Sequence, residues 1–268
     1  MSEFLATMAD RSRERADAAA RQHPPEGLRE LALSGPRPRP LGQFGATFDL
    51  IAEIKPSSPS EGRFPDRDPA AAATGYQSGG AGMLSVITEP SSFRGSLDNL
   101  RRVVAVAEIP VMAKDFLVDT YQVYEARRAG ADGVLLIARI LSDELLAAMI
   151  EVTGELGMFA LLEAFNGEDL VRLSAAADGF DNLLFGVNCR DLDTLKIVPK
   201  RHEELIGLLP AGRIAVAESA MRGEEDAERI ASLGYRAALV GSALMRSEAA
   251  PDLVRSMVDA GRRVAVSA

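Results

Sequence analysis

Short aliphatic runs separated by helical segments are the feature of this sequence that most restricts its fold. The runs recur from Phe48 onward, and each has the near-continuous Val, Ile and Leu character of a strand buried on both faces. Alternating strands and helices form parallel sheets with right-handed crossovers. Eight runs are present: Asp49–Ile54, Gly82–Ile87, Pro110–Lys114, Gly133–Ile137, Met158–Glu163, Leu183–Asn188, Ile214–Glu218 and Ala237–Gly241.

This number of units predicts a (β/α)8 TIM barrel of the α/β class over residues 48–268. A doubly wound open sheet is the competing architecture, but the unit count favours the barrel. In residues 1–47, the stretch Glu3–Gln22 carries charges and alanines at helical spacing. The prolines from Pro36 to Pro40 predict an extended tether. We therefore expect one catalytic barrel domain with an extra N-terminal helical segment.

The charge balance and the cysteine count exclude several classes of partner. The 268 residues include 39 acidic and 30 basic side chains, a formal charge of −9, so we expect no nucleic-acid partner and no membrane partner. The single cysteine, Cys189, excludes an internal disulfide and predicts a cytoplasmic protein. His23 and His202 lie far apart with no cysteine cluster, so we expect no metal and no cofactor.

The first aliphatic run ends with two charged residues. Glu53 and Lys55 are two positions apart, so on a strand their side chains point to the same side. Charged side chains are rarely buried without a partner. One interpretation is a structural ion pair at the strand end. The other is that the strand delivers both groups into a pocket, over which the turn Ser57–Ser60 closes.

Polar residues also end or follow most of the other runs. The carboxyl ends of the strands of a barrel lie together, and the chemistry of these folds takes place there. Each residue alone could be an ordinary strand-end polar group. Together, lysines and carboxylates shift one another's pKa values and serve as general acids and bases near neutral pH. The candidates are Glu53, Lys55, Lys114, Glu163, Asn188, Arg190 and Glu218.

Small residues after the last two runs predict an anion site. Ser219-Ala220 and Gly241-Ser242 stand where barrels commonly bind phosphate through backbone N–H groups. Tight turns are the alternative interpretation, because Gly-Ser pairs are common in turns. The predicted partner is a small phosphorylated substrate.

A set of motifs runs in order through the predicted barrel: Ile51-Ala-Glu-Ile-Lys55, Ser58-Pro-Ser-Glu-Gly62, Lys114-Asp-Phe116, Tyr121-Gln-Val-Tyr-Glu-Ala-Arg127, Gly130-Ala-Asp132, Asn188-Cys-Arg-Asp-Leu192, Glu218-Ser219 and Leu239-Val-Gly-Ser-Ala-Leu-Met-Arg246. In these motifs the chain resembles the indole-3-glycerol phosphate synthase family of tryptophan biosynthesis. The segment before Phe48 is similar to the family's extra segment, which covers the mouth of the barrel.

The resemblance implies a carboxy-lyase reaction. In this family, 1-(2-carboxyphenylamino)-1-deoxyribulose 5-phosphate closes to indole-3-glycerol phosphate with loss of carbon dioxide and water. By resemblance, Lys114 is the general acid that protonates the substrate carbonyl, and Glu163 is the base of the later dehydration. Lys55 lies near the departing carboxylate and is able to serve as an acid.

The remaining roles are carried over from the family in the same way. Glu53, Asn188 and Glu218 orient the lysines and the substrate hydroxyls. Arg190 anchors the anthranilate end, and Phe116 contributes to the wall around the aromatic ring. The phosphate-binding positions are Ser58, Ser219, Ala220, Gly241 and Ser242.

Four residues depart from the family's usual pattern. Pro56 and Ala113 replace basic residues, which removes positive charge from the mouth, and Cys189 replaces an asparagine. Ala220 replaces the customary glycine of the phosphate loop. An alanine there either adopts a positive φ, at a cost of about 1 kcal/mol or more, or turns its amide away from the anion.

These departures leave two alternatives open. One is a divergent phosphate-binding barrel enzyme, such as a sugar-phosphate isomerase or decarboxylase. The other is a catalytically silent paralogue that serves as a scaffold or a ligand sensor. Association with other enzymes of the tryptophan pathway is left open as well.

Overall fold

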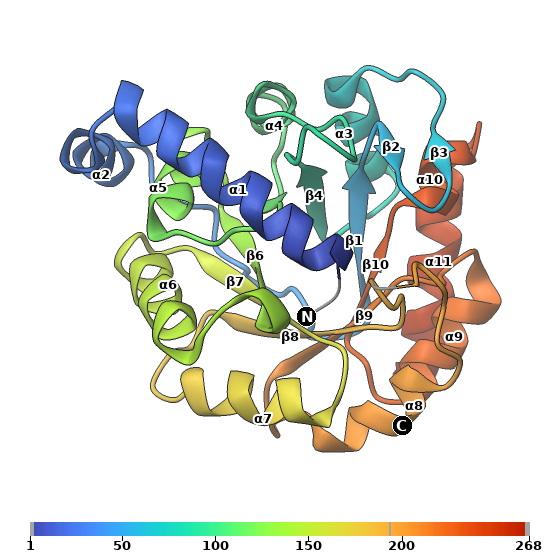
Figure 1. Cartoon of the computed structure of the whole chain (residues 1–268). Coiled ribbons are helices and arrows are strands. Elements are labelled where there is room, and N and C mark those ends of the chain that lie inside the picture. Colours follow the sequence, from blue (N-terminus) through green and yellow to red (C-terminus); the bar gives the residue numbers. More distant parts are fainter. Residues whose placement is uncertain (1–2, 193, 266–268) are drawn as a thin grey trace.

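The computed structural model describes residues 3–192 and 194–265. Residues 1–2 of the predicted N-terminal segment and residues 193 and 266–268 of the predicted barrel domain lie outside the described residues. Within the described chain, eight parallel strands form a closed barrel, which confirms the predicted fold (Figure 1). The first strand pairs with both the last strand and the second barrel strand, and this closure excludes an open sheet. The barrel strands are β1 (Asp49–Ile54), β4 (Met83–Ile87), β5 (Val111–Lys114), β6 (Gly133–Ile137), β7 (Phe159–Ala164), β8 (Leu183–Asn188), β9 (Ile214–Glu218) and β10 (Ala237–Val240).

The side chains of each strand alternate between two hydrophobic cores. On β1, Leu50, Ala52 and Ile54 belong to the core between the strands and the surrounding helices, whereas Ile51 belongs to the core inside the barrel. Because strand side chains alternate with period two, Glu53 also points inward. The last inward position of a strand therefore lies at the carboxyl end of the barrel.

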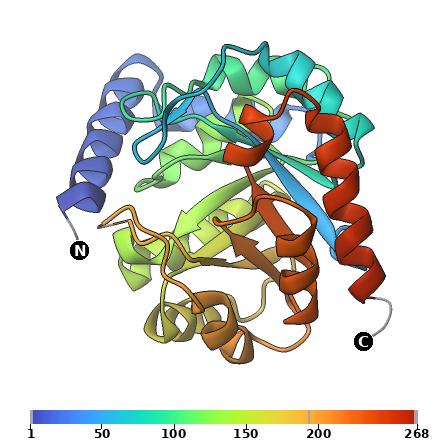
Figure 2. The ribbon, with the colours of Figure 1, turned by 90° about the vertical axis from the view of Figure 1, so that its right-hand side faces the viewer.

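Helices connect the strands and enclose the barrel (Figure 2). Five of them begin at a side chain that accepts a hydrogen bond from a free backbone N–H of the first turn: Asp68, Ser96, Asp119, Ser142 and Asn166. None of the described helices combines the length and the apolar character needed to cross a bilayer. The helices after β1 are α3 (Pro69–Ser78), α4 (Leu97–Val104), α5 (Thr120–Arg128), η1 (Ala138–Ile140), α6 (Asp143–Glu155), α7 (Gly167–Ala176), α8 (Arg201–Leu205), η2 (Ile206–Leu208), α9 (Glu224–Ser232), α10 (Ser242–Arg246) and α11 (Ala250–Ala265).

The N-terminal helix α1 (Glu3–Gln22) spans the residues predicted for it and lies over the barrel (Figure 1), against the segments that follow β4 and β5. The ring of Phe4 packs edge-on against Phe116, with the ring centroids 6.1 Å apart. The guanidinium of Arg15 lies 2.7 Å from the carboxylate of Asp115 and 3.4 Å from that of Glu89. Helix α1 therefore covers part of the barrel mouth.

A second helix and the proline-rich tether follow α1. Helix α2 (Pro25–Ser34) begins at a proline whose fixed φ suits the first helical position. Arg39 of the tether donates a hydrogen bond of 2.9 Å to Asp132, and Arg127 donates to the carbonyl of Pro36. The tether is thus fixed to the outside of the barrel.

Candidate active site

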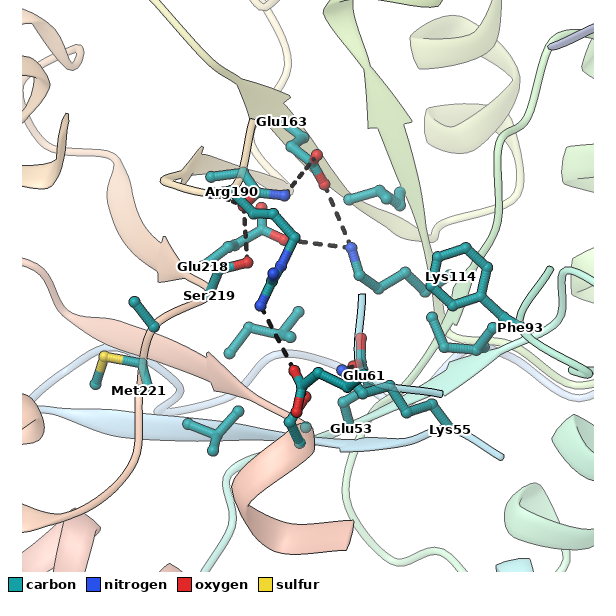
Figure 3. Close-up of a pocket in the computed structure, with 18 of the residues that line it drawn as sticks. Glu53, Lys55, Glu61, Phe93, Lys114, Glu163, Arg190, Glu218, Ser219 and Met221 are labelled. Carbon is teal, nitrogen blue, oxygen red and sulfur yellow. Dashed lines mark hydrogen bonds and ion pairs between the residues drawn. The ribbon is translucent and has the colours of Figure 1, made fainter. Parts of the chain in front are cut away.

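A cavity of about 550 Å³ opens at the carboxyl end of the barrel. Successive side chains of a strand point alternately into and out of the barrel. On β1, β5, β7, β8 and β9 the last side chain that points inward is polar, and these five side chains form the charged wall of the cavity. Figure 3 shows several of these side chains converging from different strands. All but one of the predicted site residues line the cavity: Glu53, Lys55, Lys114, Phe116, Glu163, Asn188, Arg190, Glu218, Ser219, Ala220, Gly241 and Ser242.

The ammonium group of Lys114 lies between two buried carboxylates (Figure 3). Its Nζ is 3.3 Å from Glu163 and 3.3 Å from Glu218. Burial on its own lowers the pKa of Lys114, but the negative charge of the neighbouring carboxyl groups, Glu163 foremost, outweighs burial and raises it. Lys114 is therefore protonated at neutral pH, which is the state that a general acid needs.

Glu163 is held in place from two sides. One oxygen faces Lys114, and the other accepts a hydrogen bond of 3.0 Å from the amide of Asn188. The Asn188 oxygen in turn accepts a hydrogen bond of 2.8 Å from the Ser219 hydroxyl. This chain of contacts fixes the orientation of the Glu163 carboxylate.

Glu218 sits in an environment that disfavours its charge. Burial and the neighbouring charge of Glu163 raise the pKa of Glu218 to about 8, against the opposing effect of Lys114. One of its buried oxygens, Oε1, has no hydrogen-bond partner in the described part of the chain. A Cβ atom on Gly186 would lie 2.2 Å from this oxygen, so only glycine leaves room for the carboxyl group at that position.

The raised pKa predicts how stability depends on pH. Folded Glu218 keeps a proton that the unfolded chain loses above about pH 4.5, so the free energy of unfolding should fall as the pH rises from about 4.5 to about 8. Glu218→Gln stays uncharged and should lack this part of the decline. Urea denaturation of both proteins at several pH values across this range measures the difference. Identical pH slopes would show that Glu218 is ionised in the folded protein.

Glu53 and Lys55 form an ion pair on the cavity wall. Their charged atoms lie 2.9 Å apart, and the Lys55 ammonium also lies 5.6 Å from the centre of the Phe64 ring. A Cβ atom on Gly241 would come within 2.2 Å of Glu53, so the absence of a side chain directly after the neighbouring strand β10 leaves space for the pair. Glu53 and Lys55 therefore form an ion pair and also line the cavity, so the two interpretations drawn from the sequence are compatible.

The loop after β9 has an unusual backbone conformation. Ser219 and Ala220 have φ values of 68° and 59°, in the left-handed region that L-residues with side chains seldom occupy. Of the two possibilities for Ala220, positive φ is the one observed. Both residues line the cavity, as do Gly241 and Ser242 at the junction of β10 and α10.

The positive φ of Ala220 places its backbone strain in the folded protein. We expect Ala220→Gly to raise the free energy of unfolding by up to about 1 kcal/mol, because glycine adopts a positive φ without strain. The greater conformational entropy of glycine in the unfolded chain offsets part of this gain. KM for a phosphorylated substrate should change by less than about twofold, because free and bound states gain equally. Thermal denaturation and steady-state kinetics measure the two effects. A large fall in KM alone would show that the alanine amide moves on binding.

Ser58 is the predicted site residue that does not line the cavity. It lies in the hairpin β2 (Ser57–Ser58) and β3 (Gly62–Arg63), and its hydroxyl is 3.3 Å from that of Ser60. Glu61, in the turn of the same hairpin, lines the cavity instead. The sequence motif contains Glu61, but nothing in the motif showed that its side chain turns inward.

The opposite side of the cavity has an apolar wall. The rings of Phe93 and Phe116 lie 6.1 Å apart, and Leu135 and Ile137 of β6 continue the surface.

Arg190 reaches the cavity from the loop after β8 and donates a hydrogen bond of 3.0 Å to the carbonyl of Leu195. This arrangement fits a flat aromatic ligand with an anionic group.

Cys189 is buried, and burial raises the pKa of its thiol to about 11, so it is uncharged. Among the described residues, no group of three or more His, Cys, Asp and Glu side chains is arranged to hold a metal ion.

A closed barrel with lysines and carboxylates converging on a cavity at its carboxyl end has the architecture of a (β/α)8-barrel enzyme. A sequence model described as indole-3-glycerol phosphate synthase matches residues 36–257. The chain belongs to the indole-3-glycerol phosphate synthase family.

Relatives of that name cover most of the chain. The indole-3-glycerol phosphate synthase of Kineococcus radiotolerans is 42% identical over 87% of this chain and 83% of its own length. That of Mycobacteroides abscessus is 40% identical over 92% of this chain and 91% of its own length. Among solved structures, 3-hexulose-6-phosphate synthase from Salmonella typhimurium matches with a TM-score of 0.66, covering 81% of this chain and all of that chain (100%). Its sequence identity of 13% supports the fold alone.

Proposed function

We propose that this protein converts 1-(2-carboxyphenylamino)-1-deoxyribulose 5-phosphate into indole-3-glycerol phosphate. The observation that carries the proposal is the position of Lys114, which is protonated between Glu163 and Glu218 on the wall of the cavity. The reaction requires a proton at the carbonyl oxygen for ring closure, a cation near the carboxylate that leaves as carbon dioxide, and a base for the proton lost in the dehydration. The cavity supplies one group for each of these needs.

In the first step, the ring carbon that bears the carboxylate bonds to the carbonyl carbon. Lys114 gives its proton to the carbonyl oxygen, which becomes a hydroxyl group. Carbon dioxide then leaves, and the electron pair of the broken bond restores the aromatic ring. In the last step, the hydroxyl leaves as water with a proton from Lys55, while Glu163 removes a proton from the adjacent carbon.

The two ends of the cavity match the two ends of this substrate. The apolar wall of Phe93 and Phe116 suits the aromatic ring, and Arg190 supplies a cation for its carboxylate. The Ser219-Ala220 and Gly241-Ser242 loops would receive the phosphate, as in other barrels of this type. Glu53 orients Lys55, and Asn188 orients Glu163.

An assay with the purified protein and this substrate tests the proposal. We expect an increase in indole fluorescence accompanied by one carbon dioxide for each indole formed. Neither product would appear with a catalytically silent paralogue. Turnover of a sugar phosphate without indole formation would instead identify the divergent isomerase or decarboxylase.

A further inference from the structure

The hairpin turn between β2 and β3 places a carboxylate among the groups suited to bind an anion (Figure 3). Glu61 accepts hydrogen bonds of 2.6 Å from the Ser242 hydroxyl and 3.0 Å from Arg246. The guanidinium of Arg190 lies 3.6 Å from the same carboxylate. Burial raises the pKa of Glu61, but these partners together with Lys55 bring it below the usual value. The group is therefore ionised at neutral pH.

The donors around Glu61 are those that a phosphate prefers. Arginine and hydroxyl groups bind phosphate oxygens through charge-assisted hydrogen bonds, as they bind a carboxylate. Two anions cannot share these donors, because like charges repel strongly in a partly buried site. Ser242 also belongs to the loop expected to receive the substrate phosphate. The carboxylate and the phosphate therefore require the same position.

We propose that Glu61 is an internal competitor for the substrate phosphate. In the free protein its carboxylate occupies the donors of Ser242 and Arg246, and it leaves when a phosphate monoester binds. The inference rests on the proposed function, because it assumes a phosphorylated substrate. It adds a residue that sets the affinity of the site and restricts it to ligands able to displace a carboxylate.

The surroundings of Glu61 allow this displacement. Its neighbours Ser60 and Gly62 are exposed, and the space around Gly62 is open, with no atom within 4 Å of a Cβ built there. The Glu61 side chain itself is 25% exposed, so it can turn to solvent without unpacking the core. Glu53 differs in this respect, because its side chain is 4% exposed and paired with Lys55.

The size of the effect follows from the fraction of molecules with a free site. If the carboxylate occupies the donors about nine-tenths of the time, the apparent Kd for an anion is about tenfold weaker than the intrinsic value. Glu61→Gln keeps the shape of the side chain but loses both ion pairs. We expect it to bind inorganic phosphate about fivefold to tenfold more tightly than the unmodified protein.

Calorimetric titration with inorganic phosphate tests the inference. Asp66→Asn is the matched control, because Asp66 lies in the same connection between β1 and α3, is almost fully exposed and pairs with Arg63 at the protein surface. It removes the same charge and should leave phosphate affinity unchanged. In an Arg246→Gln background, the gain from Glu61→Gln should shrink, because one shared donor is missing.

Equal or weaker phosphate binding by Glu61→Gln would overturn the inference, since it would show that Glu61 leaves the site unobstructed or organises the arginines. Undetectable binding by both proteins would overturn it as well. The titration needs no turnover, so it separates this inference from the proposed function. Tighter binding by Glu61→Gln in a protein that forms no indole would leave Glu61 as the competitor and refute the synthase activity alone.

Discussion

Lys114→Met is expected to lower kcat by about 10²-fold to 10⁴-fold, the range of general acid catalysis. Lys114 is the protonated group held between two carboxylates on the cavity wall, so its loss removes the proton needed at the substrate carbonyl. Methionine keeps an unbranched side chain that is one atom shorter. Rapid-mixing measurements should show that ring closure, carbon dioxide release and indole fluorescence are all lost together, because the acid serves the first step.

The fold should survive this substitution at neutral pH. With a pKa of about 8, Glu218 is largely protonated, so Glu163 does not face a second full charge when the lysine is removed. Circular dichroism and thermal denaturation check this point. Lys200→Met is the matched control, because Lys200 is exposed and lies outside the cavity. A Lys114→Met protein that retains more than about a tenth of the original activity would exclude Lys114 as the essential acid.

The barrel could be predicted from the sequence because its strands are buried on both faces. Burial on both faces leaves continuous aliphatic runs, and their alternation with helical segments is typical of a parallel sheet enclosed by helices. The predicted strand ends also agree closely with the structure. β4 begins at Met83 and β10 ends at Val240, each one residue inside the predicted run.

The charged wall of the site could be predicted for a related reason. Since inward positions alternate, a polar residue at the end of an aliphatic run either faces the cavity or breaks the core. Lys114, Glu163 and Glu218 satisfy this rule, and the structure brings them within hydrogen-bonding distance. The alternation of side chains along a strand can be read from the sequence, so this part of the site could be predicted from it.

Contacts made by loops and by distant segments could not be predicted in this way. The inward turn of Glu61 depends on the hairpin conformation, and the pairing of Arg15 with Glu89 and Asp115 joins α1 to the segments that follow two barrel strands. No periodicity determines these contacts. The need for Gly186 is of the same kind, because it becomes visible only once the Glu218 carboxyl group is placed opposite it.

Glu163→Gln should reduce the overall rate by about 10²-fold to 10⁴-fold and stop the reaction at a later point than Lys114→Met does. The substitution removes a base but keeps the shape of a side chain that is almost completely buried. Its amide cannot satisfy both neighbours, because Lys114 and Asn188 both donate to the carboxylate. One lost hydrogen bond to a charged group costs about 1.5–3 kcal/mol, so the melting temperature should fall by several degrees.

Single-turnover measurements distinguish the role of this base from that of the acid. If Glu163 acts in the dehydration, Glu163→Gln should still release about one carbon dioxide per active site, while indole fluorescence lags far behind. Glu168→Gln, a change of the same kind in the first turn of α7 and outside the cavity, should behave as the unmodified protein. Retained activity with a sharply lowered melting temperature would make Glu163 a structural partner of Lys114. Loss of the carbon dioxide burst would move its action to ring closure, where Lys114 alone is expected to control the proton.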